Sequence, residues 1–295
     1  MEANPKAPPI AKRDYGVFKG AARQIPDAMR DRLSALLRAA PETAGVPDEE
    51  RGEILGRLRE DLAELRVSSS VRMDESARTF TLSAQEVDWM ERQPDSRWIE
   101  YLVYRYKFKV FPRQRKLGAF PLHLVIEPAS MCNLRCVMCF QVDEAYRKDP
   151  MGLIPWELFV SVVDQARAHG CHAITMASRG EPTLHKRFGE MLRYVADSGA
   201  MDIKINTNAT RLPERLCHDI LAAGVNEVVF SVDSGTKETY EEIRVGGRFE
   251  EVVANIERFN AIRARDYPRS PTVTRVSGVL VREDQDPDQM ASFWG

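Results

Sequence analysis

The spacing of hydrophobic residues changes along this chain of 295 residues. Between residues 26 and 65, apolar side chains recur three or four positions apart, as they do along one face of a helix. This spacing predicts two helices separated at Gly45-Val46-Pro47. The apolar positions are Met29, Leu33, Leu36 and Leu37 in the first helix and Ile54, Leu58, Leu62 and Leu65 in the second.

Residues 71–91 combine two local signals. Two short apolar segments, 71–73 and 79–82, flank a polar turn and predict a hairpin. Ser83 is followed three positions later by Glu86, which matches a capping box. That match predicts a short helix running through residue 91.

Residues 97–116 interleave aromatic rings with lysine and arginine. Such a segment is typical either of a surface for nucleic acid or an acidic partner, or of an element that packs its rings and leaves its charges in water. Because the formal net charge of the whole chain is only −2, we favour packing and expect no nucleic-acid partner.

From residue 121 onward, strand and helix patterns alternate with short turns between them. This alternation predicts the fold class α/β with a parallel sheet. Predicted strands lie at 122–128, 172–177, 202–206, 227–232 and 273–281. Predicted helices lie at 155–168, 187–198, 213–223 and 237–265, the last broken at Gly246-Gly247, and another begins at Pro287.

The composition, 43% hydrophobic and 29% charged, is that of an ordinary globular protein. No apolar run approaches the ~18 residues that a membrane helix needs, so we expect no membrane span. Residues 1–25 lack the apolar core of a secretory signal and are expected to form a mobile leader, which favours a cytoplasmic location. We expect a mainly helical region at 26–118 and the α/β domain at 119–295.

Three of the five cysteines, Cys132, Cys136 and Cys139, follow the first predicted strand with C-x3-C-x2-C spacing. A structural zinc site normally has four ligands, and an electron-transfer cluster normally has four cysteines. Three thiolates on one loop suit a [4Fe–4S] cluster with one iron left open, while a zinc site or a disulfide is the alternative. Cys171 and Cys217 are expected to be small buried apolar residues.

This cysteine spacing after a strand resembles that of the radical S-adenosylmethionine (SAM) superfamily. The resemblance covers about residues 120–295 and implies a partial (βα)6 barrel. The chain has five predicted strands, so either the barrel lacks its last strand or the chain is a shortened form. The resemblance also implies that the three cysteines hold a [4Fe–4S] cluster whose open iron binds SAM.

Three later strand ends follow the order of motifs in that family. Residues 178–182 resemble its Gly-Gly-Glu-Pro motif, with Arg179 replacing the first glycine, and residues 206–210 resemble its Thr-Asn-Gly stretch, with Ala209 replacing the glycine. Arg244, on the next predicted helix, could pair with a carboxylate, but we expect it in solvent, as most helix arginines are. The residues that the resemblance places against SAM are Ser178, Gly180, Glu181, Pro182, Asn206, Asn208, Ser231 and Asp233.

The resemblance implies a radical SAM enzyme that cleaves SAM reductively and abstracts hydrogen from a peptide, sugar or cofactor precursor. It also implies a reducing partner such as flavodoxin or ferredoxin. Residues 132–247 most resemble the peptide- and sulfatase-maturing enzymes and the molybdenum-cofactor cyclase, without the later cysteines of an auxiliary-cluster domain. The alternatives are a degenerate iron–sulfur and SAM-binding module without turnover, and a zinc-stabilised scaffold.

Overall fold

The computed structural model describes residues 26–39, 48–62, 67–68, 80–143, 151–177, 179–283 and 285–295. The chain divides into two compact units, Met1–Ile99 and Glu100–Gly295. The domain boundaries expected near residues 25 and 118 stay predictions. No helix among the described residues is long and apolar enough to cross a membrane.

In the first unit, two helices bury the periodic apolar faces that the sequence predicts. The capping box is confirmed: the Ser83 N–H donates to the Glu86 carboxylate at 2.7 Å, and the Glu86 N–H donates to the Ser83 hydroxyl at 3.3 Å. Residues 71–79 of the predicted hairpin, and Leu65, lie outside the described residues. The elements are α1 (Asp27–Ala39), α2 (Asp48–Asp61), β1 (Val67–Ser68), β2 (Leu82–Ser83), which pairs in parallel with β1, α3 (Ala84–Arg92) and η1 (Asp95–Arg97).

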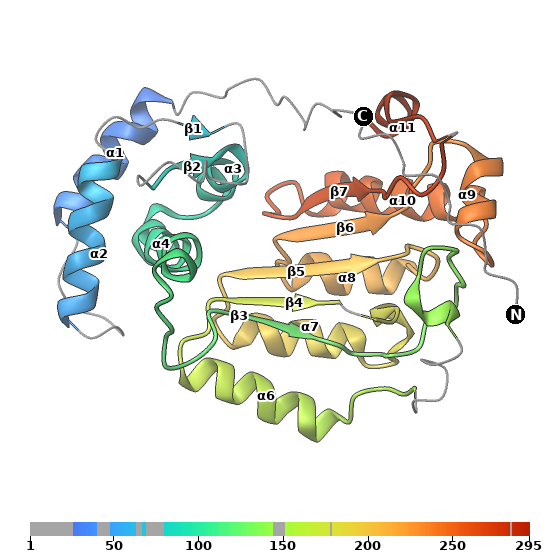
Figure 1. The fold of residues 1–295 in the computed structure, drawn as a ribbon, viewed down its shortest axis with the longest axis horizontal. Coiled ribbons are helices and arrows are strands. Elements are labelled where there is room, and N and C mark those ends of the chain that lie inside the picture. The colour runs from blue at the N-terminus through green and yellow to red at the C-terminus, as the bar shows by residue number, and fades with distance from the viewer. Residues whose placement is uncertain are drawn as a thin grey trace, which may run out of the picture. The chain divides into compact units, whose positions relative to one another are not determined.

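The second unit is built on a parallel sheet of five strands in the order β3-β4-β5-β6-β7 (Figure 1). The predicted α/β fold class is therefore confirmed. The strands are β3 (His123–Ile126), β4 (Ala173–Met176), β5 (Asp202–Thr207), β6 (Glu227–Ser231) and β7 (Val273–Ser277). The helices and short turns are α4 (Trp98–Gln114), η2 (Phe140–Val142), α6 (Trp156–Ala168), η3 (Pro182–Leu184), α7 (Phe188–Asp197), α8 (Glu214–Ala222), α9 (Lys237–Ile243), α10 (Phe249–Asp266) and α11 (Pro287–Trp294).

Each strand is followed by a helix, and α7, α8 and α10 lie along one face of the sheet (Figure 1). The alternate residues of each strand that face these helices form the core, for example Ile174, Ile205 and Phe230. The opposite face of the sheet includes polar residues, and two of them, Lys204 and Glu227, form an ion pair at 3.0 Å. Because all five strands run parallel, their carboxyl ends lie at a common edge of the sheet.

One of the later predicted elements matches the structure, and another differs from it in extent. The predicted helix 237–265 is indeed interrupted near Gly246-Gly247, between α9 and α10. The prediction of a strand reaching residue 281 was wrong, because β7 ends at Ser277. After it, the Val279 N–H donates to the Asp233 carboxylate at 2.8 Å instead of to a neighbouring strand.

The aromatic and basic segment forms α4. Tyr104 is buried and stacks on His172, with ring centroids 5.2 Å apart, and Phe108 lies against His123. The packing interpretation of these rings is therefore confirmed. The basic side chains of α4 do not all extend into water, since the Arg105 guanidinium lies over the rings of Tyr104 and Phe108.

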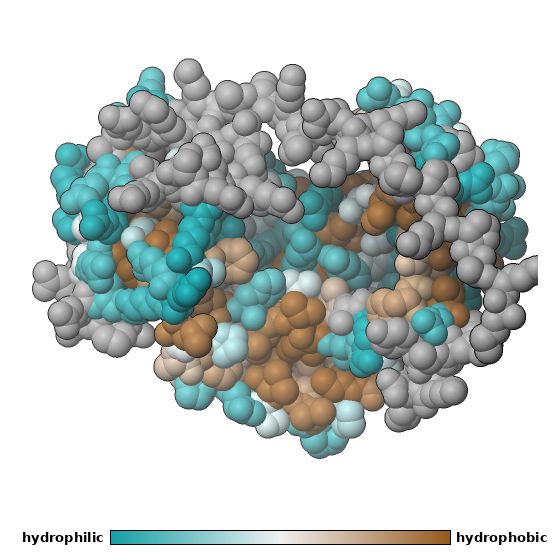
Figure 2. Space-filling model, in the orientation of Figure 1, coloured by the Kyte–Doolittle hydropathy of each residue, from teal (hydrophilic) through white to brown (hydrophobic). Residues whose placement is uncertain are grey.

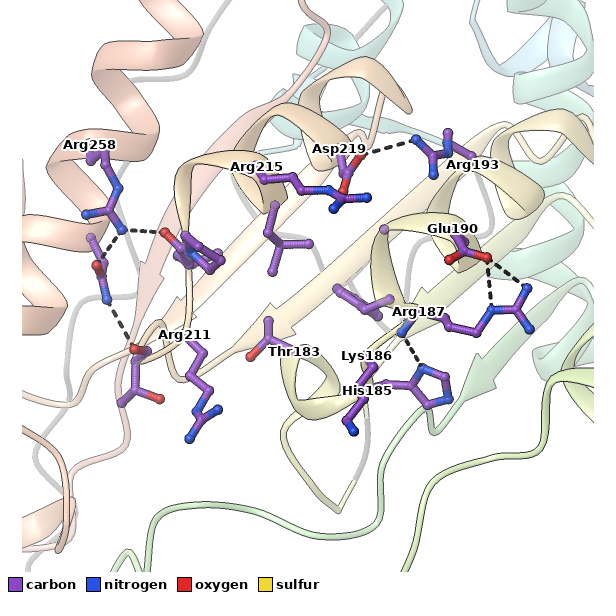
Figure 3. Close-up of a pocket in the computed structure, with 17 residues that line it drawn as sticks. Thr183, His185, Lys186, Arg187, Glu190, Arg193, Arg211, Arg215, Asp219 and Arg258 are labelled. Carbon is purple, nitrogen blue, oxygen red and sulfur yellow. Dashed lines mark hydrogen bonds and ion pairs between the residues drawn. The ribbon is translucent and has the colours of Figure 1, made fainter.

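The surface of the second unit carries apolar and basic features. Figure 2 shows hydrophobic surface in the region of β3 and α6, where Val125 and Leu158 are exposed. A pocket of about 560 Å³ opens beside the starts of α7 and α8 (Figure 3).

Candidate active site

The three cysteines of the C-x3-C-x2-C motif lie on the loop that follows β3, at the carboxyl edge of the sheet. Cys136 is buried, and Cys132 and Cys139 are partly buried. All three are free thiols, as are Cys171 and Cys217, so the disulfide alternative finds no support. In α/β barrels this edge is where chemistry takes place.

The start of the cysteine loop is held by the Gly180-Glu181-Pro182 turn after β4. The Glu181 N–H donates to the Met131 carbonyl at 2.9 Å. A Cβ atom at Gly180 would lie 2.1 Å from the Ala129 carbonyl oxygen, so only glycine allows this approach. Arg179, where the related motif has glycine, forms an ion pair with Glu127 at 2.7 Å and leaves the close approach at Gly180 intact.

Glu181 connects the ends of two strands. Its carboxylate accepts hydrogen bonds from the Thr207 hydroxyl and the Asn208 N–H, both at 2.7 Å, and also from Thr183. Burial raises the pKa of the Glu181 carboxyl, and these donors oppose the shift. Glu181 therefore positions the loop after β5, and its carboxylate is occupied within the protein.

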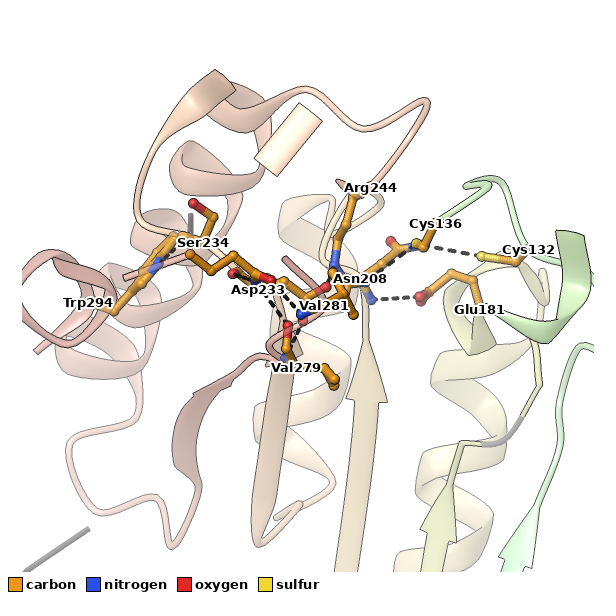
Figure 4. Close-up of polar contacts among 11 residues, drawn as sticks. Cys132, Cys136, Glu181, Asn208, Asp233, Ser234, Arg244, Val279, Val281 and Trp294 are labelled. Atoms are coloured by element: carbon orange, nitrogen blue, oxygen red, sulfur yellow. Dashed lines mark hydrogen bonds and ion pairs between the residues drawn. The ribbon is translucent and has the colours of Figure 1, made fainter. Parts of the chain in front are cut away.

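Asn208 lies on one side of the cysteine loop, beside Cys132 (Figure 4). Its side-chain amide donates to the Asn133 side chain at 3.1 Å and approaches the Cys132 sulfur at 3.7 Å. The next residue, Ala209, adopts a positive φ of 59°, a conformation that glycine adopts more readily. The structure thus keeps a backbone shape suited to glycine where the related motif has one.

Arg244 lies on the other side of the loop, beside Cys136 (Figure 4). Its guanidinium donates to the Asp233 carboxylate at 2.7 Å and lies 4.0 Å from the Cys136 sulfur. The expectation of a solvated Arg244 was wrong, because only 10% of this side chain is exposed. Burial raises the pKa of the Cys136 thiol to about 11, and the Arg244 cation opposes that shift.

The loop backbone completes its attachment at the end of α9. The Arg135 N–H donates to the Val245 carbonyl at 2.8 Å, and the Val137 N–H donates to the Ile243 carbonyl at 2.9 Å. The cysteine loop is therefore fixed on both sides, by β4–β5 residues at its start and by α9 further along.

The other predicted SAM contacts fall into different environments. Asn206 places its side-chain oxygen in a buried position with no hydrogen-bond partner among the described residues. Ser231 ends β6 and is partly buried, whereas the Asp233 side chain is buried and held by Arg244 and Val279. Pro182 is buried at the start of η3. Ser178 lies outside the described residues.

Among the residues that the structure describes, no three His, Cys, Asp or Glu side chains lie close enough to hold a single metal ion. A structural zinc ion normally has four ligands, whereas the loop offers three cysteines. A cluster with several irons binds each thiolate at a separate iron and needs no such convergence. Three cysteines on one loop are thus a donor set that a cluster with one open iron would fit.

A singly wound parallel α/β unit with three thiols on its first strand–helix loop defines a class of cofactor-dependent enzymes. Residues 126–293 match the model of the radical SAM superfamily, which is more than half of the chain, so the chain belongs to that superfamily. Radical SAM enzymes use a [4Fe–4S] cluster and SAM, and they need a reductant and a substrate.

Comparison with curated proteins finds relatives that share only part of their length. A GTP 3′,8-cyclase from Desulforamulus reducens is 30% identical over 165 residues, 56% of this chain and 50% of that protein. A tungsten-containing aldehyde ferredoxin oxidoreductase cofactor-modifying protein from Pyrococcus furiosus is 36% identical over 112 residues, 38% of this chain and 30% of that protein. The chain thus spans half or less of the length of these relatives.

Among solved structures, Streptococcus suis SuiB bound to S-adenosylmethionine aligns with a TM-score of 0.50. The two are 18% identical, and the alignment covers 74% of this chain and 54% of SuiB. This likeness supports the partial-barrel fold.

Sequence reasoning missed the role of Gln141, and it ranked pairing of Arg244 with a carboxylate below exposure to solvent. The Gln141 side-chain amide donates to the carbonyls of Ser130 and Arg179, both at 2.7 Å, and so connects the end of the cysteine loop to its start and to the turn after β4. The sequence held only a weak signal for either residue, because a helix arginine and a loop glutamine are usually solvent-facing.

Proposed function

We propose that Cys132, Cys136 and Cys139 hold a [4Fe–4S] cluster and that the chain acts as a radical SAM enzyme. It would cleave SAM reductively and abstract hydrogen from a peptide, sugar or cofactor precursor. The observation that carries this proposal is the set of three free thiols on one loop at the carboxyl edge of a parallel sheet.

Two polar side chains beside the loop oppose the rise in thiol pKa that burial causes. Arg244 brings a buried cation to Cys136, and Asn208 brings an amide donor to Cys132. Both interactions favour the ionised form of the thiols, which metal binding requires. When bound, the cluster supplies the electron for cleavage of SAM.

The residues proposed to bind SAM contribute in two ways. Asn206 offers a buried amide oxygen without a partner among the described residues, as expected of a group that awaits a ligand. Ser231 adds a hydroxyl at the next strand end. Gly180, Glu181 and Asp233 support the site by positioning its backbone, because their close contacts are within the protein.

The proposed reductant is a one-electron carrier such as flavodoxin or ferredoxin. Free thiols and an oxygen-sensitive cluster both suit a reducing compartment, so we infer a cytoplasmic location.

The test is anaerobic reconstitution with iron and sulfide, followed by dithionite and SAM, with 5′-deoxyadenosine measured by chromatography. Cys136→Ala is expected to lose the cluster absorption and the product. Cys171→Ala is the matched control, since Cys171 is also a buried thiol but lies outside the loop. It is expected to retain both.

The other outcomes discriminate between the alternatives. A cluster that forms without 5′-deoxyadenosine would support the degenerate binding module and contradict the proposed turnover. Stoichiometric zinc with no iron–sulfur absorption would support the zinc scaffold.

A further inference from the structure

The pocket beside α7 and α8 is strongly basic. It lies on the outside of the barrel, near the carboxyl ends of β4 and β5, and its wall also includes part of α10 (Figure 3). Six cations against two carboxylates, Glu190 and Asp219, leave an excess of four positive charges, although the whole chain carries −2. The cations are Lys186, Arg187, Arg193, Arg211, Arg215 and Arg258.

The charges of this basic pocket are only partly neutralised. Arg187 pairs with Glu190 at 2.8 Å, and Arg193 pairs with Asp219 at 3.2 Å. Lys186 and Arg211 are without an ion pair or side-chain hydrogen bond among the described residues. A concave surface with uncompensated charge of one sign attracts an oppositely charged partner and accelerates its association.

The basic pocket adjoins the cysteine loop. Thr210 lines the pocket, and its hydroxyl accepts a hydrogen bond of 2.9 Å from the Asn133 side chain. Asn133 is the residue next to Cys132, and Arg211 is the residue next to Thr210. A single hydrogen bond therefore connects the pocket wall to the loop that carries the thiols.

We propose that the basic pocket is the docking surface for an acidic protein that carries one electron to the cluster. The proposal rests on the proposed function. In the transfer, the carrier is oxidised by one electron and the cluster is reduced by one, and no covalent bond forms.

The form of the basic pocket favours a protein over a small anion. Most of its cations lie on an open rim: the side chains of Arg187 and Arg193 are 42% and 52% exposed, and Arg211 and Arg215 are exposed as well. Two carboxylates lie among them, so the positive charge is spread over the surface instead of converging on one point. A broad charged rim next to a redox centre suits a transient electron-transfer complex.

The test uses a charge-reversed double variant, Lys186→Glu with Arg211→Glu. The matched control, Arg167→Glu with Arg269→Glu, makes the same change of charge at exposed positions at the end of α6 and after α10, by the amino edge of the sheet. Binding of an acidic flavodoxin to each reconstituted protein is measured by surface plasmon resonance at low and high salt. Formation of 5′-deoxyadenosine is measured with reduced flavodoxin and, separately, with dithionite.

We expect the pocket variant to bind flavodoxin at least about tenfold more weakly at low salt, with a matching rise in KM for flavodoxin. High salt should reduce the difference, because it screens the charges. Dithionite needs no docking surface, so its product yield should equal that of the wild type. The control variant should behave as the wild type in every assay.

Three results would overturn the inference. One is equal flavodoxin affinity in the pocket variant and the wild type. Another is an equal loss in the pocket and control variants, which would reveal only a net-charge effect. The third is saturable binding of inorganic phosphate to the pocket together with flavodoxin binding that the phosphate does not reduce. That result would assign the pocket to a small anion. Absence of dithionite-driven product in the wild type would refute the proposed function itself.

Discussion

The two sides of the cysteine loop each contain a buried carboxylate, but they satisfy it in different ways. On the amide side, Glu181 accepts hydrogen bonds from neutral donors, including Thr207 and Asn208. On the charged side, Asp233 pairs with the Arg244 guanidinium. Neutral donors hold a loop in place without adding charge, whereas the ion pair also delivers a cation to Cys136.

The two sides therefore contribute differently to the cysteine loop, one to its backbone path and the other to its electrostatics. The amide side determines the path of the backbone, through the close contact at Gly180 and the bonds of Glu181. The charged side determines the electrostatic potential at the thiols. Variants on the two sides should therefore affect stability for different physical reasons.

The largest effect is expected from Arg244→Met. It would leave the Asp233 carboxylate, whose side chain is 1% exposed, buried without its cation, at a cost of about 3–5 kcal/mol in the free energy of unfolding. Urea unfolding followed by circular dichroism measures this loss. A second substitution, Asp233→Asn, removes the unpaired charge and should recover most of the lost free energy of unfolding. A double variant as unstable as Arg244→Met would contradict the charge-pair explanation.

Gly180→Ala should be next, with a loss of about 3 kcal/mol from overpacking. The new Cβ would meet backbone carbonyls of Ala129 at 2.1 Å and Met131 at 2.4 Å, which cannot rotate away as a side chain would. Gly152→Ala is the control, because a Cβ there has no neighbour within 4 Å. Equal melting temperatures for the two variants would show that the Gly180 contact relaxes freely.

Asn208→Ala is expected to cost about 1 kcal/mol, because it removes hydrogen bonds to Asn133 and Thr210. Asn206→Ala, on the same segment, deletes an amide oxygen with no partner among the described residues and should leave stability unchanged or raised. Urea midpoints of the two variants test this contrast. The reverse order would mean that Asn206, and not Asn208, holds the loop.

The smallest effect should appear as a pH dependence through Glu181. Its folded-state pKa is raised above the ordinary value of 4.5, so above that pH the folded protein keeps a proton that the unfolded chain releases. The contribution of the Glu181 carboxyl to the free energy of unfolding therefore falls as the pH rises above 4.5. Glu181→Gln lacks this titration, so the stability of the wild type relative to this variant should fall as the pH rises above 4.5. Parallel pH profiles would exclude the effect.

Much of the fold could be predicted from local patterns. The strand–helix alternation predicted the parallel sheet, the Ser83 and Glu86 pair predicted a capping box, and Gly246-Gly247 predicted the break between α9 and α10. These signals act over a few residues, so the chain itself carries them. The end of β7 was predicted too late, because the Val279 N–H finds its acceptor on Asp233, far away in sequence.

The sequence by itself determined the parallel α/β unit and the three-cysteine loop, because periodicity and motif spacing are local properties. The tertiary structure decided that Arg244 lies buried beside a cysteine 108 positions away, and that Asn208 reaches back to Cys132. It also gathered cations from α7, α8, α10 and the segments that precede α7 and α8 into one basic pocket. Burial and pairing depend on which strand ends meet at the common edge, and only packing of the whole sheet brings those residues together.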